Sequence, residues 1–382
     1  MSQKVVHIVL NPFTQDSRVI RECKSLTKKG YDVTVIAYWL EGLNVEEREN
    51  GYKIIRIPIV TKSWSKHPII QIIKYLEFLI RSLFIIKKIK PDICHGHDPD
   101  GLLIGYFVKY FLRSKLIYDS HELWSDSIHL KGDKQILYKI GRKIEKILIK
   151  YAEVVIAVNK SILDVIKKEN NIKCTAVVRN IPHAIECVTQ FTKKELGFPD
   201  CDSNIIYVGN IERGRGIEVM IKSMGRVHNN IGLVLMGKDS AFKRDMEKLS
   251  KTKKLESRIR FIESVSPNQI LSVCKLADVG IAPIENLCKS YYLSLPNKIF
   301  EYIHAELPVL VSDFPEMKNI IENYSVGEVF NVDEPSSIIG VINNYFDNPD
   351  KIIKYEQNCL QASKELNWDN EEKQLFNLYK KL

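Results

Sequence analysis

The sequence predicts an α/β protein of two doubly wound domains, and three observations support this fold class. Short apolar runs alternate with longer segments of helical period along most of the chain. The alternation lapses once, near the middle, and then starts again. The length of 382 residues accommodates two domains of about 150 residues each. Repeated β-α alternation with apolar strands is typical of parallel sheets that helices cover on both faces.

The N-terminal half begins with a complete β-α-β unit. A strand is expected at Val5–Leu10, a helix after Asp16 that Gly30 stops, and a second strand at Val33–Ala37. The same alternation predicts further strands at Ile54–Ile57, Asp92–Cys94, Leu116–Tyr118, Val154–Val158 and Thr175–Val178. We therefore expect a first Rossmann-like domain over residues 1–184.

Residues 185–203 are polar, contain Gly197 and Pro199, and are interpreted as a linker. A second domain over 204–350 follows, with a helix at Ile217–Val227 and strands at Ile205–Val208, Leu233–Met236, Ile259–Ile262, Val279–Ala282 and Val309–Val311. Residues 351–382 are expected to form charged helices that pack back on the N-terminal domain. Ligands of such sheets bind beyond the carboxyl ends of the strands, so we expect the two domains to face a central cleft.

Composition narrows the class of protein. The formal net charge of +9 fits a partner that is an anion, such as a phosphate, nucleic acid or an acidic membrane surface, and it equally fits simple solubility. The eight cysteines form no Cys-x-x-Cys pair, and we interpret them as free thiols in a reducing compartment. Neither a signal-peptide pattern nor an uninterrupted apolar stretch of about 18 residues occurs, so a cytoplasmic location is expected.

The strongest local feature is the loop after the strand Ile205–Val208, which contains Gly209, Asn210, Arg213, Arg215 and Gly216. Glycines let the backbone approach a ligand closely, the following helix supplies free N–H groups, and the arginines add forked donors. Together these groups suit a diphosphate. The loop is neither a Walker A nor a G-x-G-x-x-G sequence, and a flexible surface turn remains the alternative.

A second feature follows the strand that ends near Pro283. Ser294 and Asn297 are residues that start helices, and Lys298 lies in the first turn, where the helix dipole disfavours a cation. An anionic ligand there would offset that cost. Glu301, one turn further, could accept hydrogen bonds from sugar hydroxyls. A routine capped helix with exposed charges is the alternative.

These two features together resemble the retaining nucleotide-sugar glycosyltransferases of the GT-B fold, specifically the large family four. Gly209 to Gly216 is similar to the family's G-R-x-x-x-x-K-G element, with Arg215 in the lysine position, and the segment from Phe300 to Leu310 is similar to E-A-x-A-x-G-x-P-V-V. Two positions depart from the family. Asn210 stands where an arginine is usual, and Leu293 stands where the first glutamate of a Glu-x7-Glu pair would fall.

The resemblance assigns further donor contacts. It implies that Glu301 contacts the donor ribose, that backbone N–H groups near Ser294 and Leu295 help to hold the phosphates, and that Val265 lies where the base is held. The S-L-P-N-K-x-F-E-Y form of this chain resembles a branch that acts in bacterial surface polysaccharide synthesis.

The N-terminal half resembles the same family. Asp16 and Arg18 belong to a D-x-R-V segment, His97 and Asp98 to H-x-H-D, and His121 and Glu122 to Y-D-x-H-E-L. The resemblance places His121 at the donor sugar near its reacting carbon, and it assigns acceptor binding to Asp16, Arg18, His97, Asp98 and Glu122.

The resemblance implies transfer of a sugar from a UDP- or GDP-sugar to a saccharide or lipid-linked acceptor with retention. The catalytic residues would be His121, Glu301 and Arg215. No metal, other cofactor or nucleic-acid partner is expected. Two alternatives stay open: a nucleotide-sugar epimerase or hydrolase of the same architecture, and a non-catalytic binding subunit.

Residues 64–90 combine apolar and aromatic side chains with six basic ones, Lys66, Lys74, Arg81, Lys87, Lys88 and Lys90, and only one acidic residue, Glu77. Such a helix can lie in a membrane interface, which would suit a lipid-linked acceptor at the inner face of the cell membrane. A core helix with a basic outer face is the other interpretation, and both remain open.

Overall fold

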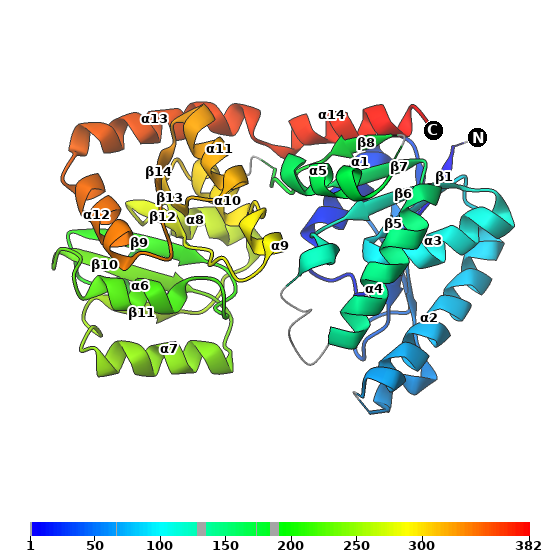
Figure 1. Cartoon of the computed structure of the whole chain (residues 1–382), viewed down its shortest axis with the longest axis horizontal. Helices are drawn as coiled ribbons and strands as arrows, with labels where there is room; N and C mark the ends of the chain where they lie inside the picture. The colour runs from blue at the N-terminus through cyan, green and yellow to red at the C-terminus, as the bar shows by residue number, and fades with distance from the viewer. Residues whose placement is uncertain (1, 66, 128–134, 173, 184–190) are drawn as a thin grey trace. The chain divides into compact units, whose positions relative to one another are not determined.

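The structure is a computed structural model of the chain, and it describes residues 2–65, 67–127, 135–172, 174–183 and 191–382 (Figure 1). The chain forms two compact units. One comprises Met1–Asn180 together with Glu371–Leu382, and the other comprises Ile181–Asn370. Each unit is a largely parallel sheet with helices on both faces, which confirms the predicted fold class of two doubly wound α/β domains.

The sheet of the first unit has the order β3-β4-β2-β1-β5-β6-β7-β8. All of its pairs are parallel except β3 with β4. Its strands are β1 (Lys4–Ile8), β2 (Asp32–Tyr38), β3 (Glu46–Glu49), β4 (Tyr52–Ile57), β5 (Ile93–His97), β6 (Lys115–Ser120), β7 (Val154–Ala157) and β8 (Thr175–Val177). The longer helices are α1 (Ser17–Lys28), α2 (Pro68–Ile89), α3 (Asp98–Leu112), α4 (Gln135–Leu148) and α5 (Lys160–Glu169). The strand order reverses between β1 and β5, which makes their carboxyl ends the switch point of this sheet.

The second sheet is parallel throughout and has the order β11-β10-β9-β12-β13-β14. Its strands are β9 (Ser203–Val208), β10 (Ile231–Met236), β11 (Ile259–Ile262), β12 (Val279–Ala282), β13 (Val309–Ser312) and β14 (Gly327–Phe330). The helices of this unit are α6 (Ile217–Met224), α7 (Ala241–Thr252), α8 (Ile270–Cys274), α9 (Lys289–Tyr292), α10 (Asn297–His304), α11 (Pro315–Tyr324), α12 (Pro335–Phe346) and α13 (Pro349–Glu365). Here the switch point lies between β9 and β12.

Burial explains why the sequence folds this way. Every residue of β10, β12 and β13 is buried, as a sheet covered on both faces requires. Helix α1 shows how an element begins, because the Asp16 side chain caps it by accepting the N–H of Val19 at 3.3 Å. Among the described residues, no helix is long and apolar enough to cross a membrane.

Some elements differ from the expectation. The strands β3 and β14 were not predicted, because β3 is an exposed, charged edge strand and β14 is short and only half apolar. Helix α13 packs on α10, α11 and α12 of the second unit rather than on the first, since its buried Cys359 and Ala362 join that core. Helix α14 (Trp368–Tyr379) begins in the second unit, and its residues from Glu371 belong to the first.

Part of the expected linker over 185–203 cannot be compared with the structure, because residues 185–190 lie outside the described residues. Of the part that is described, Phe198 is buried in the core of the second unit. The cysteines agree with the expectation of free thiols over the described residues. Cys23, Cys94, Cys274, Cys288 and Cys359 are buried, and Cys174 and Cys201 are half-buried.

Candidate functional site

The loop after β9 is shaped by glycines at the switch point of the second sheet. Gly209, Gly214 and Gly216 have φ angles of 126°, 82° and 71°, which L side chains rarely adopt. A Cβ on Gly216 would lie 1.8 Å from the carbonyl oxygen of Pro283, which follows β12. Gly216 is therefore required because two loops of the protein approach each other closely there. The sequence had suggested a different reason, namely the close approach of a ligand.

The arginines of this loop have different surroundings. Arg215 is half-buried, donates from Nε to Glu212 at 3.1 Å, and lies with its guanidinium 4.9 Å from the centre of the Tyr291 ring. Burial lowers the pKa of Arg215, but the nearby Tyr291, Tyr207 and Glu212 outweigh it and raise that pKa above its usual value. Asn210 and Arg213 are both exposed. Arg213 can therefore reach a ligand freely, whereas Arg215 must first exchange its pairing with Glu212.

A carboxylate already lies at the start of α6. Glu285 Oε1 accepts the N–H of Gly216 at 3.0 Å, and the N–H of Glu285 donates to the carbonyl of Gly214 at the same distance. Sequence reasoning missed Glu285, although its position just after β12 is the signal that could have found it. One of the N–H groups expected for a phosphate is thus occupied by a side chain of the protein.

Lys298 is the most unusual charge in the second unit. Its side chain is 9% exposed, and Nζ lies 3.4 Å from the centre of the Tyr207 ring. Burial, and then the nearby charge of Arg215, lower the pKa of Lys298 well below its usual value, and Glu301 raises it only in part. Within the described residues, no carboxylate lies at ion-pair distance from Nζ. A Cβ on Gly209 would lie 3.5 Å from this ammonium, so the cation sits beside the loop after β9.

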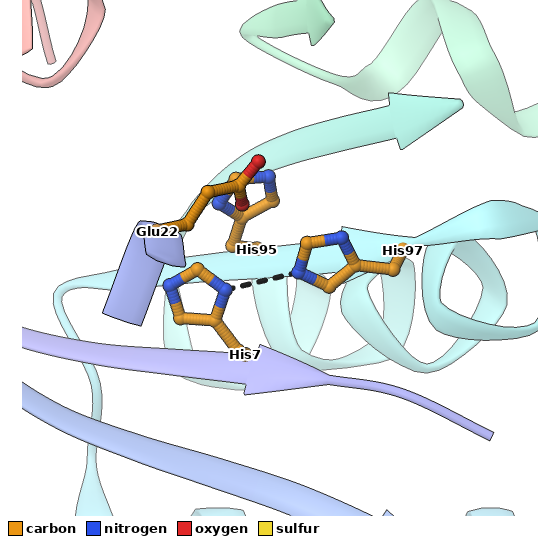
Figure 2. Close-up of side chains that lie close together, drawn as sticks. All are labelled: His7, Glu22, His95 and His97. Atoms are coloured by element: carbon orange, nitrogen blue, oxygen red, sulfur yellow. Dashed lines mark hydrogen bonds between the residues drawn. The ribbon is translucent and has the colours of Figure 1, made fainter. Parts of the chain in front are cut away.

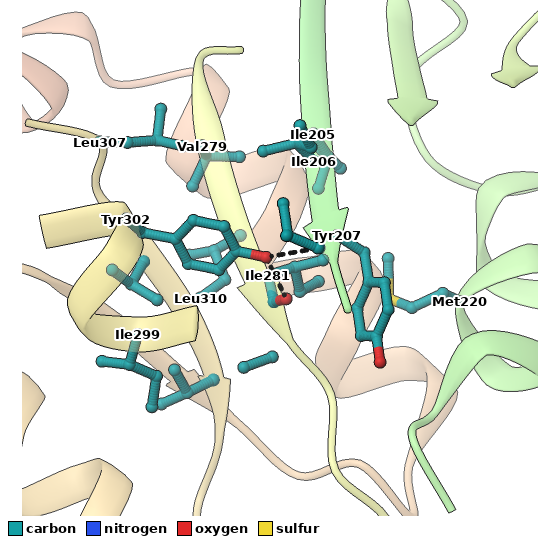
Figure 3. Close-up of a cluster of buried hydrophobic side chains, with 14 of the residues drawn as sticks. Ile205, Ile206, Tyr207, Met220, Val279, Ile281, Ile299, Tyr302, Leu307 and Leu310 are labelled. Carbon is teal, nitrogen blue, oxygen red and sulfur yellow. Dashed lines mark hydrogen bonds between the residues drawn. The ribbon is translucent and has the colours of Figure 1, made fainter. Parts of the chain in front are cut away.

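Helix α10, which carries Lys298, is fixed to the sheet by Tyr302 (Figure 3). The hydroxyl of Tyr302 accepts the N–H of Val208 at 2.9 Å and donates to the carbonyl of Ile281 at 3.3 Å, and the ring is fully buried. These bonds join α10 to the ends of both switch-point strands, β9 and β12. The sequence pattern gave no sign of this tie, because Tyr302 looks like any other core aromatic residue.

The other expected donor residues lie between α9 and α10, on α10, and after β11. Ser294 closes α9, where its hydroxyl donates to the carbonyl of Tyr291 at 2.7 Å, and Leu295 packs against the core. Asn297 opens α10, and Glu301 lies half-buried one turn further. Val265 follows β11 and is half-buried against the core. Leu293, at the position of the missing glutamate, is buried.

In the first unit, a cavity of about 500 Å³ opens at the carboxyl ends of the strands. Its walls include Asp16, Arg18 and His121, so the structure brings these three expected residues together. Asp16 also accepts a hydrogen bond from Asn11 at 2.8 Å, in addition to capping α1. The cavity is therefore bounded by the start of α1 and by the loop after β6.

Arg18 forms an internal ion pair below this cavity. It is 2% exposed, and it donates from Nε and a terminal nitrogen to both oxygens of Asp119, at 2.8 and 2.9 Å. Another terminal nitrogen donates to the carbonyl of Val178 at 2.6 Å. Burial raises the pKa of Asp119, but Arg18 and His121 outweigh it and hold that pKa well below its usual value. Asp119 was not singled out from the sequence, although it stands inside the Y-D-x-H-E-L segment.

His121 connects the cavity with the interior. Its Nε2 lies 3.0 Å from His97 Nδ1, and its backbone N–H donates to Asp98 Oδ1 at 3.0 Å. Burial lowers the pKa of His121, but the carboxylates of Asp98 and Asp119 raise it to about 10. Asp98 adopts a φ of 57° and also accepts the indole N–H of Trp124 at 3.0 Å.

His97, Asp98 and Glu122, the remaining acceptor candidates, are not among the residues that line the cavity. His97 is buried behind His121, at 3% exposure. Glu122 accepts a hydrogen bond from Ser127 at 3.5 Å. At His121 the arrangement provides a cationic imidazole facing the cavity, held by two carboxylates, and this can orient a ligand rich in hydroxyl groups or a charged one.

Two families of known proteins match the chain in succession. Residues 16–196 match the family described as Glycosyltransferase Family 4, and residues 188–365 match Glycosyl transferases group 1. A curated relative, the chitobiosyldiphosphodolichol beta-mannosyltransferase of Debaryomyces hansenii, is 23% identical over 96% of this chain and 86% of its own.

Solved structures match over almost the full length. The sucrose-phosphate synthase of Thermosynechococcus elongatus superposes with a TM-score of 0.84 at 16% identity, covering 99% of this chain and 98% of its own. HepE of Anabaena, in complex with UDP and glucose, superposes with a TM-score of 0.74 at 12% identity and full coverage of both chains. These likenesses show the fold, and the two family matches show which glycosyltransferase families the two halves of the chain are similar to. The chain carries a Glycosyltransferase Family 4 domain followed by a Glycosyl transferases group 1 domain, on a fold of the GT-B type.

Proposed function

We propose that the chain transfers a sugar from a UDP- or GDP-sugar to a saccharide or lipid-linked saccharide, with retention of the anomeric configuration, in cell-surface polysaccharide synthesis. The observation that carries the proposal is the desolvated ammonium of Lys298. It lies beside Gly209 at the switch point of a parallel sheet, where ligands of such sheets bind. A buried cation for which the described residues supply no ion-pair partner is costly, and a bound diphosphate would remove that cost.

The chemistry follows from the charges at this place. When the bond between sugar and diphosphate breaks, negative charge grows on the leaving diphosphate, and fixed cations lower the barrier by stabilising it. Lys298 and Arg213 are available for this role, and Arg215 joins them when it leaves Glu212. The diphosphate is held by cations of the chain itself, so the proposal needs no metal there.

The other contacts are assigned by position. We assign the ribose to Glu301, the base to the backbone at Val265, and further phosphate contacts to the backbone at Ser294 and Leu295 and to Asn297. In the first unit we assign the transferred sugar to His121. The acceptor is assigned to the surroundings of the cavity described above, which are formed by Asp16, Arg18, His97, Asp98 and Glu122.

Two similarities support the class of substrate. HepE, which shares the fold, was solved with UDP and glucose. The name of the Debaryomyces hansenii relative gives a diphosphodolichol-linked saccharide as acceptor, which is a lipid-linked substrate. A nucleotide-sugar donor and a lipid-linked acceptor are therefore the first compounds to test.

A lipid-linked acceptor would suit the outer surface of α2 and α3. Helix α2 buries Phe78, Leu79, Ser82 and Ile86 on one face. Its other face exposes Ile69, Ile73, Leu76, Ile80 and Phe84, and α3 exposes Tyr110 and Phe111 beside it. An apolar groove of about 480 Å³ runs between the two helices, with Lys87 at its wall. The two interpretations of residues 64–90 thus describe two faces of one helix, and we propose that the exposed face touches an anionic membrane surface.

Vesicle sedimentation tests this contact. The wild-type chain should sediment with vesicles that contain an anionic lipid and less with neutral ones, and Phe84→Glu should weaken the binding. Ile353→Glu, at another exposed apolar residue, is the matched control and should leave binding unchanged. Equal binding by wild type and Phe84→Glu would contradict the contact.

The activity is tested with a panel of UDP- and GDP-sugars, by measuring release of nucleoside diphosphate with and without a lipid-linked acceptor. We expect release that depends on the acceptor, together with a new glycoside whose anomeric configuration matches that of the donor. Epimerised or free sugar without any acceptor would favour an epimerase or hydrolase. Failure of every nucleotide sugar to bind would favour a non-catalytic subunit.

A further inference from the structure

A cluster of buried ionisable side chains lies in the interior of the first unit (Figure 2). His7 comes from β1, His95 and His97 from β5, and Glu22 from α1. All four side chains are 0–3% exposed. Each offers one ligand atom, and these atoms lie within 4.8 Å of one another. The three elements meet at the switch point of the sheet, so the fold brings together residues that are distant in the sequence.

Among the described residues, several buried polar atoms of this cluster have no hydrogen-bond partner. These are His7 Nε2, His95 Nε2 and both carboxylate oxygens of Glu22. Arg18 Nε lies 3.2 Å from Glu22 Oε1, and no other ion pair of this carboxylate occurs within the part of the chain that the structure describes. A buried polar atom without a partner costs about 1–3 kcal/mol, so several such atoms at one point require an explanation.

The second nitrogen of each of the two histidines is already engaged. His7 Nδ1 lies 2.9 Å from His97 Nε2, and His95 Nδ1 lies 2.8 Å from the hydroxyl of Tyr379. If each Nδ1 carries the proton and donates it to these partners, each Nε2 is left with a lone pair. His97 then carries its own proton on Nδ1, which lies 3.4 Å from Asp119 Oδ2, and the cationic His121 donates to the same oxygen from Nε2 at 3.3 Å. Histidines that bind metals have this arrangement, since the non-ligating N–H is held by an acceptor that fixes the ring.

We propose that His7 Nε2, His95 Nε2 and the Glu22 carboxylate bind one divalent cation of the zinc class. Two imidazoles and one carboxylate are a ligand set that Zn²⁺ accepts, with a water as the fourth ligand. Ligands of a tetrahedral zinc lie roughly 3.3 Å apart, so the cluster contracts when the ion binds. His97 then acts as the partner that orients His7.

The neighbouring group of His97, Asp119 and His121 is less suited to an ion, although its ligand atoms also lie close together. Both oxygens of Asp119 already accept hydrogen bonds from Arg18, and His97 Nδ1 lies at hydrogen-bond distance from His121 Nε2. In contrast, His7 Nε2, His95 Nε2 and Glu22 Oε2 have no hydrogen-bond partner among the described residues. The ion therefore belongs at the deeper cluster.

The ion would have a structural role. It would join β1, β5 and α1 beneath His121, and it would act on His121 through His7, His97 and Asp119, because His97 Nδ1 and His121 Nε2 lie 3.4 and 3.3 Å from Asp119 Oδ2. The sequence led us to expect no metal, because no set of possible ligands has the short spacing of a metal motif. This inference does not depend on the proposed transferase activity, and it is tested without a substrate.

The experiment measures the metal content of the untagged full-length chain by mass spectrometry after gel filtration. We expect about one zinc-class ion per chain, a lower melting temperature after treatment with a chelator, and its recovery when Zn²⁺ is added. Substitution by Co²⁺ should give visible absorption bands. The variant Glu22→Gln should lose the ion, and His67→Gln, at an exposed histidine, should keep it.

The wild-type measurement decides the matter even if Glu22→Gln fails to fold. A folded chain that contains no metal, and whose melting temperature Zn²⁺ does not change, would overturn the proposal and leave ordered water as the partner of these atoms. Loss of the ion in His67→Gln, with retention in Glu22→Gln, would also overturn it, because the ion would then lie at the surface.

Discussion

Replacement of Lys298 by methionine separates a ligand-binding cation from a structural one. Methionine keeps most of the volume of the side chain and removes the charge. In the chain without ligand, this ammonium is desolvated and lies against the Tyr207 ring without a carboxylate at ion-pair distance among the described residues. Lys298→Met should therefore leave the free energy of unfolding unchanged or raise it. Binding of a nucleoside diphosphate should weaken, because the phosphate loses a charged donor.

The size of the binding effect follows from the kind of bond lost. A hydrogen bond to a charged group contributes about 1.5–3 kcal/mol, which corresponds to a loss of roughly 10- to 150-fold in affinity. The pH dependence of the free energy of unfolding provides a second test of the charge on Lys298. Because the pKa of Lys298 is lowered in the folded chain, the unfolded chain binds more protons between that lowered value and 10.5. The free energy of unfolding therefore gains a contribution as the pH rises through this range, and Lys298→Met lacks it.

The assay combines titration calorimetry with UDP and GDP and chemical unfolding without nucleotide. Lys222→Met is the matched control, because Lys222 is 53% exposed and pairs with Glu218 on α6. It should change neither quantity. The reasoning is refuted if Lys298→Met binds both nucleotides as tightly as the wild type, or if it unfolds more easily while affinity is preserved.

Three further predictions concern buried polar groups of the two units. Asp119→Asn removes the carboxylate that pairs with Arg18 through two hydrogen bonds and leaves this buried cation with Glu22 alone at ion-pair distance among the described residues, so it should lower the free energy of unfolding by up to about 3–5 kcal/mol in urea titrations. Burial raises the pKa of Glu145 to about 7, so the folded chain binds more protons than the unfolded chain between pH 4.5 and 7, and stability falls as the pH rises through that window. Glu145→Gln should remove this fall, which amounts to about 3 kcal/mol, in unfolding curves measured from pH 4.5 to 8. Tyr302→Phe should cost about 1–3 kcal/mol of unfolding free energy and weaken nucleotide binding, because a buried N–H of β9 loses its acceptor.

Each of these predictions has its own control or contradiction. For Asp119→Asn the control is Glu46→Gln, whose partner Lys53 is 34% exposed, and which should cost less than about 1 kcal/mol. If the free energy of unfolding falls equally with pH in the wild type and in Glu145→Gln, Glu145 does not cause the fall. Tyr302→Phe with unchanged stability would mean that water replaces the lost hydroxyl.

The sequence predicted the fold well because the buried strands of a doubly wound sheet are nearly continuous apolar runs. The strand at Ile259–Ile262 is found at the expected residues, and most others differ only at their ends. The edge strand β3 was missed because its side chains are charged and exposed, so no apolar pattern marks it. Helix α13 shows a second limit, since helical period does not say which of two cores a helix joins.

For the sites, the sequence located the loops but not the pairings within them. It singled out Lys298 from its place in the first turn of a helix, and the structure adds that this ammonium is desolvated and lies on Tyr207. It could not show that Glu285 occupies the N–H of Gly216, because this contact depends on how two loops meet. The sequence also did not predict the buried cluster of His7, His95 and Glu22, because these residues are distant in the sequence and meet only when β1, β5 and α1 pack together.

The central claim is that the diphosphate of a nucleotide-sugar donor binds at Lys298 and Gly209 in the second unit. A crystal structure of the full chain with UDP or GDP measures this most directly. The account predicts a phosphate oxygen within hydrogen-bond distance of Lys298 Nζ, with the diphosphate against the loop that begins at Gly209. A nucleotide bound elsewhere, with Lys298 still resting on Tyr207 and touching no phosphate, would contradict it.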